Sequence, residues 1–470
     1  MGGTVELPVW FVVLAGTLAT AGLVDRLLTP AMRWFFRRRV NRAIDEVNTR
    51  LKLKIRPFGL TNRQVLVDRL AHDPAVLAAA EAHAREGNMP VEVAMDTAQR
   101  YAREIVPSFN AYAYFRIGIR LARLISTAFY RVRLGYQDAT ALEGVDEDAT
   151  VIFVMNHRSN MDYVLVTYLA SASAALSYAV GEWARVPVLQ PLIRAMGAYF
   201  IRRDARNLLY RRVLARYVQM ATEAGVTQAV FPEGGLTRDG RLRPVRLGLL
   251  SYMVAGYRAG GREVVFIPVG LNYDRVLEDR SLIGELTGDR PKLSSMAKAR
   301  KTARFLMHNL RLRIQGRWHR FGYACVSFGQ PIALSGFLGQ WGVADASLLP
   351  EDRRQALTQE LGEMLIGEIA RVIPALPVAL VATALIESGE AGISELALKA
   401  RVHEMINALE ARGAHVHIPR ADHDYAVTAG LRMLEMRHIA QRGEDGMIAL
   451  VPGEETIAAY YANSIAHLLG

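Results

Sequence analysis

Short apolar runs rich in β-branched residues recur along the middle of the chain and constrain its fold most strongly. These runs cover residues 150–155, 227–231, 264–267 and 324–328. A run of this length is typical of a strand buried within a sheet. Between the first two runs, Leu209, Val213 and Tyr217 recur at helical spacing, and Gly225 ends that segment. Alternating strands and helices predict an α/β fold with a parallel or mixed sheet flanked by helices.

The amino-terminal residues 7–24 carry no charge. As a helix they would be about 27 Å long, close to the thickness of the hydrocarbon core of a bilayer. Trp34, Phe35 and Phe36 follow, and then a basic cluster that extends to Arg42. Aromatic residues beside a basic cluster favour a membrane–water boundary, with the basic side facing the cytoplasm. The pattern predicts a single membrane anchor.

Two alternatives to the anchor are open. Residues 19–21, Ala-Thr-Ala, resemble the cleavage site of a signal peptide. However, no Lys or Arg precedes the apolar run and Glu6 is acidic, which is unusual for a signal peptide. The segment could also be an ordinary buried or interfacial helix.

The 470 residues exceed one ordinary compact core, so two or three domains are expected. Helical patterns occupy residues 61–125, and a linker at residues 341–350 precedes a mainly helical region. The prediction is an anchor with its basic flank, a helical N-terminal domain, an α/β domain and a mainly helical C-terminal domain. Their predicted bounds are residues 1–42, 43–125, 126–340 and 341–470.

The formal net charge of +11 indicates polyanionic partners: nucleic acid, an anionic membrane surface or phosphorylated substrates. A basic surface without a specific partner is the alternative. No zinc-finger, RNP or helix-turn-helix signature favours nucleic acid. The single cysteine, Cys325, cannot form an intramolecular disulfide, which fits a reducing compartment. Cys325 is predicted to be a buried strand residue and not a nucleophile.

The strongest local motif is Asn-His-Arg-Ser-Asn-Met-Asp at residues 156–162, directly after the first apolar run. Active-site loops of α/β sheets gather at such strand ends. Ser159 or Asn160 can cap the following helix. On one continuous helix, His157 and Asp162 would point about 140° apart. A strand–turn–helix junction can instead fold the Asp162 carboxylate back onto the imidazole.

Such a pair would suit general-base chemistry. Asp162 would fix the tautomer of His157 through one ring nitrogen, and the other nitrogen could take a proton from a substrate hydroxyl. The alternative is a surface histidine beside an unrelated helix-capping aspartate. No HExxH or CxxC pattern occurs, so no metal site is expected.

Further polar blocks at residues 197–203, 230–238 and 266–274 follow or end strand-like runs, so all could meet at one edge of the sheet. Arg203 and Arg238 can offer forked donors to phosphate oxygens, although either could be a solvated surface charge. Gly234 and Gly235 allow the backbone to approach a ligand, or form a plain turn. Glu233 can hold an arginine or bind a substrate hydroxyl.

The four blocks, in this order, resemble the glycerolipid acyltransferase superfamily, and most closely its bacterial and mitochondrial glycerol-3-phosphate acyltransferases. The superfamily hallmark is a His and an Asp separated by four residues. Residues 100–107 and 460–465 also resemble the flanking regions of those enzymes. The resemblance implies the glycerolipid acyltransferase fold, with His157 as catalytic base and Asp162 as its partner. It implies acceptor-binding roles for Arg202, Arg203, Glu233, Gly234, Gly235, Thr237, Arg238 and Arg246, and places Pro268 in a block tied to donor binding or packing.

Two departures from the family pattern concern the acceptor. Relatives usually have Arg-Ser-Arg after the glycines, whereas this chain has Leu236, Thr237 and Arg238. Arg246 also stands where a lysine is usual. These changes leave hydroxyl acylation intact and put the identity and affinity of the acceptor in question.

The resemblance implies acyl transfer from acyl-CoA or acyl-carrier protein to the sn-1 hydroxyl of glycerol 3-phosphate, without a cofactor, at the cytoplasmic side of a bacterial inner membrane. Alternative acceptors are dihydroxyacetone phosphate and lysophosphatidic acid. A non-catalytic lipid-binding relative and a His-based hydrolase are further alternatives. No nucleic-acid partner is expected.

Overall fold

The computed structural model describes residues 61–170, 175–181, 189–202, 207–286 and 320–470, with the single residues 300, 304, 311 and 315. The predicted anchor and Arg203 lie outside these residues. Within the described ranges, no helix is both long and apolar enough to cross a bilayer.

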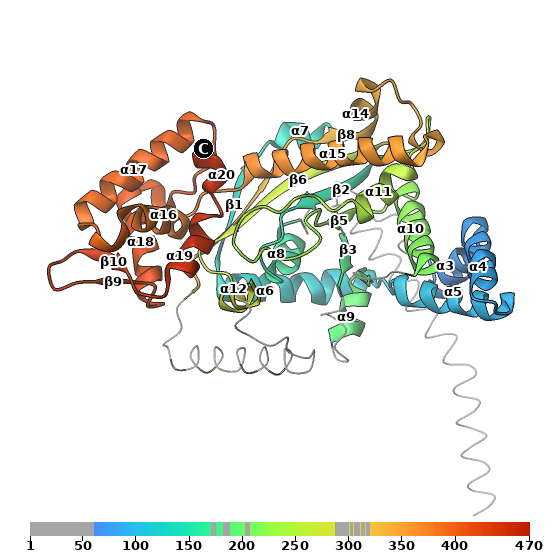
Figure 1. Ribbon diagram of the computed structural model, residues 1–470, viewed down its shortest axis with the longest axis horizontal. Coiled ribbons are helices and arrows are strands. Elements are labelled where there is room, and N and C mark those ends of the chain that lie inside the picture. Colours follow the sequence, from blue (N-terminus) through green and yellow to red (C-terminus); the bar gives the residue numbers. More distant parts are fainter. Residues whose placement is uncertain are drawn as a thin grey trace, which may run out of the picture. The chain divides into compact units, whose positions relative to one another are not determined.

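A mixed eight-stranded sheet forms the centre of the described chain, in the order β1-β7-β6-β2-β5-β3-β4, with β8 paired to β6 (Figure 1). Strands β4, β3, β5, β2 and β6 run parallel, whereas β7 and β8 pair with β6 antiparallel. Its strands are β1 Arg131–Gln137, β2 Thr150–Met155, β3 Ser177–Val180, β4 Tyr199–Phe200, β5 Gln228–Val230, β6 Val264–Tyr273, β7 Tyr323–Phe328 and β8 Ile332–Ala333. The predicted mixed sheet is confirmed.

All four predicted strands are present, with small differences at their ends. Strand β2 has the predicted bounds, and β6 continues to Tyr273, six residues beyond its predicted end at Ile267. Sequence patterns did not predict β1, β3 or β8, whereas β4 lies in the block at residues 197–203, which was described as following or ending a strand-like run. Strand β1 is an edge strand with mostly exposed side chains, among them Arg131 and Arg133, so it lacks the apolar run of a buried strand.

Alternate residues of β2 face opposite sides of the sheet, as the two-residue period of a strand requires. Val151, Phe153 and Met155 pack into one hydrophobic cluster, while Ile152 and Val154 pack into the other. All six residues of the strand are buried. Helices must therefore cover both faces, and Figure 1 shows α15 and α6 on opposite sides of the sheet.

The cluster containing Ile152 is completed by helices from three parts of the chain. They are α3 Arg63–Ala71, α4 Pro74–Glu86, α5 Val91–Ile105, α10 Leu208–Glu223, α11 Gly248–Ala255, α14 Leu334–Gln340 and α15 Glu351–Val372. The predicted helix around Val213 is α10, and Gly225 follows its end with a φ of 76°. The amino-terminal helices thus share a core with the sheet.

The cluster containing Phe153 includes helices on either side of the His157 motif and most of the helices of the carboxyl-terminal region. They are α6 Ile119–Phe129, α8 Met161–Ala170, α12 Asp279–Leu286, α16 Pro377–Ser388, α17 Glu395–Ala411, α18 His423–Glu435 and α19 Glu455–Ala462. The carboxyl-terminal region also holds a hairpin, β9 Ala440–Arg442 with β10 Ile448–Leu450, and the short helix α20 Ala466–Leu469. The predicted mainly helical character is confirmed; the domain bounds stay predictions.

Candidate active site

The loop between β2 and α8 holds His157 and Asp162 together. His157 Nδ1 lies 2.9 Å from Asp162 Oδ2, and both side chains are buried. Strand β2 ends at Met155 and α8 begins at Met161, so the chain reverses between the two residues. The strand–turn–helix junction therefore brings the carboxylate back to the imidazole, as the sequence predicted.

The Asp162 carboxylate is held by four donors. Oδ2 accepts the backbone N–H groups of Arg158 at 2.8 Å and Ser159 at 3.0 Å, besides its contact with the imidazole. Oδ1 accepts the hydroxyl of Tyr273 at 2.6 Å. Because Oδ2 accepts from Nδ1, the His157 proton lies on that nitrogen. Nε2 is the ring nitrogen that can take a substrate proton.

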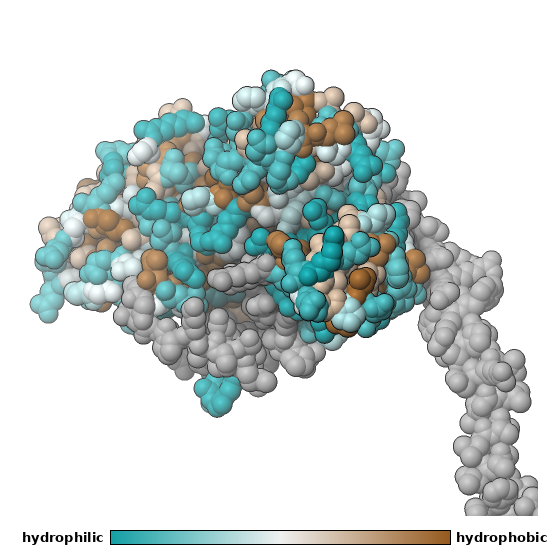
Figure 2. Space-filling view, turned by 45° about the vertical axis from the view of Figure 1, so that its right-hand side comes forward, coloured by the Kyte–Doolittle hydropathy of each residue, from teal (hydrophilic) through white to brown (hydrophobic). Residues whose placement is uncertain are grey.

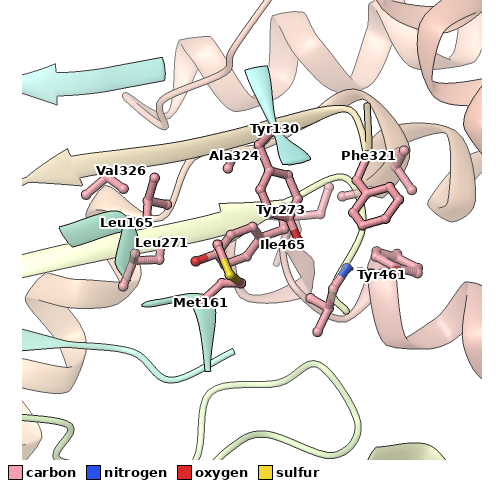
Figure 3. Packing of buried hydrophobic residues seen from close by; sticks show 14 of the residues in the cluster. Tyr130, Met161, Leu165, Leu271, Tyr273, Phe321, Ala324, Val326, Tyr461 and Ile465 are labelled. Atoms are coloured by element: carbon pink, nitrogen blue, oxygen red, sulfur yellow. Dashed lines mark hydrogen bonds between the residues drawn. The ribbon is translucent and has the colours of Figure 1, made fainter. Parts of the chain in front are cut away.

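Tyr273 is a site residue that sequence patterns missed. Figure 3 shows its ring packed beside Tyr130 and Met161, and the Tyr130 and Tyr273 ring centroids lie 5.3 Å apart. Burial, together with the charge of Asp162, raises the pKa of Tyr273 well above its ordinary value, so the hydroxyl stays protonated as a donor. Its position at the carboxyl end of β6 was the one available signal.

The His157 ring is packed between aromatic residues. It stacks on Phe231, with centroids 3.9 Å apart, and meets the edge of Tyr163 at 5.5 Å. Phe231 directly follows β5, which neighbours β2 in the sheet. The sheet and α8 thus fix the plane of the imidazole from both sides.

Glu233 supports the same loop through the backbone. Its Oε1 accepts the N–H of His157 at 2.7 Å, and its Oε2 accepts the N–H of Arg243 at 2.8 Å. Burial raises the pKa of Glu233 to about 7, against the opposing effect of the two N–H donors and the nearby arginines. Glu233, a predicted acceptor-binding residue, therefore lies at the site. Both of its carboxylate oxygens accept hydrogen bonds from the protein backbone.

Glu233→Gln is expected to change how stability depends on pH. The folded-state pKa, about 7, lies above the ordinary value of 4.5, so the folded protein keeps a proton that the unfolded chain releases. The free energy of unfolding should therefore fall by roughly 1–3 kcal/mol as pH rises from about 4.5 to about 7. Glutamine does not titrate, so the free energy of unfolding of the wild type minus that of the variant, both from urea unfolding, should decrease as pH rises across this window. Glu410→Gln, at an exposed position on α17, is the control, and a difference that stays constant would contradict the raised pKa.

Thr237 closes the loop that contains Glu233. Its backbone N–H donates to the carbonyl of His157 at 3.0 Å, and its buried hydroxyl donates to the carbonyl of Arg241 at 2.8 Å. Gly234 has a φ of 68°, and a Cβ there would lie 2.7 Å from Arg246 Cδ. Gly235 is buried. These predicted acceptor-binding residues lie beside His157, with the Thr237 side chain engaged inside its own loop.

The predicted acceptor-binding arginines differ in their ion pairing and in their exposure to solvent. Arg202 forms two hydrogen bonds to the Glu104 carboxylate, at 2.9 and 2.5 Å, and lies over the rings of Tyr101 and Tyr210. Arg238 is half exposed, and its nearest carboxylate oxygen is that of Glu285 at 3.6 Å. Arg246 is exposed and lies against Gly234. Arg203 lies outside the described residues.

Parallel pairing explains why these residues share one edge. Strands β2, β5 and β4 point the same way, and His157, Glu233 and Arg202 each follow the carboxyl end of one of them. Pro268 instead lies within β6, opposite Val154 of β2, where its carbonyl accepts the N–H of Gly329 at 2.8 Å. The fourth block thus contributes packing at Pro268 and a site residue at Tyr273.

The carboxyl-terminal region contacts the site directly, a role that sequence patterns left open. Arg158 is buried, donates to the carbonyl of Gly240 at 2.9 Å and lies over the Tyr460 ring at 5.2 Å. Asn463 Nδ2 donates to the carbonyl of Asp239 at 2.9 Å. Helix α19 and the residues after it therefore touch both the His157 loop and the Thr237 loop.

A second set of contacts reaches the His157 loop from the other side. Glu278, which follows β6, accepts the Ser159 hydroxyl at 2.7 Å and Asn160 Nδ2 at 3.1 Å. Its neighbour Asp279 pairs with Arg437 at 2.6 Å, and Arg437 also donates to the Tyr461 hydroxyl at 2.8 Å. The carboxyl-terminal region therefore helps to position Glu278 and Asp279, and through Glu278 the loop that contains His157.

The described residues supply no group of three or more His, Cys, Asp or Glu side chains that could hold a metal ion. Cys325 is buried in β7, as predicted, and burial raises the pKa of its thiol to about 12. The chemistry that the geometry supports is proton removal by an oriented imidazole beside exposed arginines.

Comparisons with known proteins show which families and proteins this chain is similar to. Residues 138–272 match the family model described as Acyltransferase, and residues 311–470 match Glycerol-3-phosphate acyltransferase C-terminal region. Proteins named glycerol-3-phosphate acyltransferase from Pseudomonas putida and Pseudomonas entomophila are 29% and 30% identical over 432 and 433 residues, which is 89% of this chain. The chain spans about half the length of these curated relatives, 50% in each case.

Among solved structures, the 1-acyl-sn-glycerophosphate acyltransferase from Thermotoga maritima is similar to this chain at 18% identity and a TM-score of 0.31. The match covers 57% of this chain and 81% of that one.

Proposed function

We propose that the chain is a member of the glycerolipid acyltransferase superfamily and that it transfers a fatty acyl chain to the sn-1 hydroxyl of glycerol 3-phosphate, which the matches to two acyltransferase family models and to enzymes of that name support. The observation that carries the proposal is the buried His157–Asp162 pair beside the loop that holds Arg238. The product is 1-acyl-glycerol 3-phosphate. The donor is acyl-CoA or acyl-carrier protein, and no cofactor takes part.

The proposed reaction uses the imidazole as general base. Asp162 holds the proton of His157 on Nδ1, and Nε2 removes the proton of the sn-1 hydroxyl as its oxygen attacks the thioester carbonyl. The new C–O bond gives a tetrahedral intermediate, which collapses as the C–S bond breaks. The thiolate is a good leaving group and takes up the proton that the imidazole carried. Arg158 N–H, Ser159 N–H and the Tyr273 hydroxyl keep Asp162 in place throughout.

The acceptor's phosphate needs cationic donors that the protein has not already paired. Arg238 meets this condition better than Arg202, because Arg202 is bound at two points by Glu104. Arg246 is exposed and lies against Gly234, which directly follows Glu233. We assign phosphate binding to Arg238 and Arg246, with Arg202 and Arg203 as further candidates.

Arg238→Gln is expected to raise KM for glycerol 3-phosphate by roughly tenfold to a hundredfold, since a hydrogen bond to a charged group contributes about 1.5–3 kcal/mol. The turnover number should change little, because the phosphate contact forms in the ground state and persists in the transition state. Initial rates over a range of acceptor concentrations measure both constants. Arg371→Gln, at an exposed position on α15, should leave both unchanged. An unaltered KM for Arg238→Gln would exclude this residue from the phosphate site.

Membrane association forms part of the proposal. Fatty acyl products partition into bilayers, the net charge is +11, and residues 7–24 carry no charge. We place the protein at the inner membrane of a bacterium, with the described residues on the cytoplasmic side.

Acyl transfer by the purified full chain tests the function. Radiolabelled acyl-CoA or acyl-carrier protein is supplied with glycerol 3-phosphate, dihydroxyacetone phosphate, lysophosphatidic acid or no acceptor. The proposal expects the highest kcat/KM with glycerol 3-phosphate. Preference for another acceptor would reassign the substrate. Release of free fatty acid without an acceptor would indicate a hydrolase, and no turnover with any combination would favour a lipid-binding relative.

A further inference from the structure

The helix formed by η1 Ala113–Gly118 and α6 turns small residues inward and large apolar residues outward along its middle. Its buried side consists of Gly118, Ala122 and Ser126 there, with the larger Tyr114 and Phe129 buried only at its two ends. Ile117, Leu121 and Leu124 lie on the outside, with Ile117 51% and Leu124 58% exposed. A helix that only had to pack in water would place its larger apolar residues toward the core. The outer side of this helix is therefore built to contact something apolar.

Arginines form a second row beside the apolar one. Ile117, Leu121 and Leu124 recur at i, i+4 and i+7, and Arg116, Arg120 and Arg123 repeat the same spacing. At about 100° per residue, the two rows lie roughly a quarter turn apart on the solvent side. The three arginines are exposed, and none forms an ion pair with a carboxylate of the described residues. These six residues constitute the α6 outer face.

Isolated apolar residues on a surface mean little by themselves. The face of the molecule in Figure 2 is mostly hydrophilic, with apolar residues in small separate patches. The α6 outer face differs because its apolar residues are aligned along one helix and are accompanied by a row of arginines that pair with no carboxylate among the described residues. Apolar and basic rows on adjacent sides of a helix are the pattern that suits the boundary between lipid headgroups and acyl chains.

We infer that the α6 outer face lies on an anionic phospholipid bilayer, with Ile117, Leu121 and Leu124 among the upper acyl chains and the arginines on lipid phosphates. The charge complementarity of three arginines with anionic headgroups favours a bilayer over a second copy of this chain, whose net charge is also positive. The inference rests on the proposed membrane association and names the surface responsible for it.

This surface lies one helix away from the catalytic pair. Helix α6 packs directly against α8, and the first turn of α8 contains Asp162. A bilayer in contact with the α6 outer face would therefore hold the His157 loop near the lipid surface, where acyl products leave. The amino-terminal segment and α6 would then give two separate attachments.

A fluorophore placed on the α6 outer face reports its surroundings. Cys325 is buried, so a cysteine introduced into the full chain can be labelled selectively. Leu124→Cys carries an environment-sensitive label, and Leu396→Cys, 80% exposed on α17, is the matched control. On vesicles of phosphatidylglycerol and phosphatidylethanolamine, the Leu124 label should shift to the blue and be quenched by nitroxide-bearing lipid. The Leu396 label should remain accessible to aqueous iodide.

Charge is tested by combining Arg116→Gln, Arg120→Gln and Arg123→Gln in the Leu124→Cys protein. Each basic residue at an anionic surface contributes roughly a fivefold factor in binding, so the lipid concentration for half-maximal response should rise about tenfold to a hundredfold. A matched triple of exposed arginines elsewhere, Arg371→Gln, Arg401→Gln and Arg442→Gln, should leave it unchanged.

Three outcomes would overturn the inference. The Leu124 label could remain accessible to iodide while the protein is vesicle-bound, or it could become shielded without lipid as protein concentration rises, which would indicate self-association. The two triple arginine variants could also need the same lipid concentration for half-maximal response. Acyl transfer with detergent-dispersed substrates separates this inference from the proposed function: activity with an unshielded label would reject the surface alone, and a shielded label without activity would reject the reaction alone.

Discussion

Replacing His157 by alanine is expected to lower kcat for acyl transfer by about a hundredfold to ten-thousandfold, the range that general-base catalysis contributes. The imidazole is buried, oriented through Nδ1 by Asp162 and stacked on Phe231, so no neighbouring side chain can take over its position. KM for glycerol 3-phosphate should change much less, because the acceptor's phosphate is assigned to arginines on another loop. Initial rates with purified variant and wild-type protein measure both constants.

His72→Ala is the control for this prediction, because it removes an exposed imidazole at the end of α3. Urea unfolding of both variants shows whether a loss of activity reflects a loss of the folded state. A folded His157→Ala protein with wild-type kcat would end the assignment of His157 as the base, whatever the comparisons with relatives indicate.

The sequence predicted those parts of the fold that depend on local pattern. Strand β2 is apolar at every position after Thr150 because both of its faces are covered, and its bounds were predicted correctly. The His157–Asp162 contact was also predictable, since the two residues are separated by a single strand–turn–helix junction. Strand β1 was missed because an edge strand with exposed arginines does not need an apolar run.

The remaining site residues come together only through the tertiary fold. Tyr273 binds Asp162 across 111 positions of sequence, and Glu278 binds Ser159 across 119. Neither pair leaves a spacing pattern that could be recognised from one sequence. Glu233 was identified as a site residue, but its hydrogen bonds to the backbone of His157 and Arg243 depend on how two loops meet. For Glu233, the sequence predicted the location of the residue but not the groups that it binds.

Gly240→Ala is expected to impair both folding and catalysis. Gly240 has a φ of 85°, and a Cβ there would lie 1.9 Å from the backbone oxygen of Tyr460. Either the Thr237 loop must move away from His157, or α19 must move away from the site. The left-handed conformation costs alanine about 1–2 kcal/mol, and the clash adds to it. We expect a total loss of about 3 kcal/mol or more in the free energy of unfolding and at least roughly a tenfold lower kcat.

Gly260→Ala separates the two causes of this effect. Gly260 also has a positive φ, 70°, but a Cβ there would meet no heavy atom within 4 Å. This variant should show only the cost of the backbone conformation, with an unchanged kcat. Urea unfolding and initial rates of the two variants therefore isolate the contact between Gly240 and Tyr460. Equal unfolding midpoints and equal turnover would mean that α19 does not constrain the Thr237 loop. A larger loss for Gly240→Ala in both measurements would show that the carboxyl-terminal region holds the catalytic loops in their working positions.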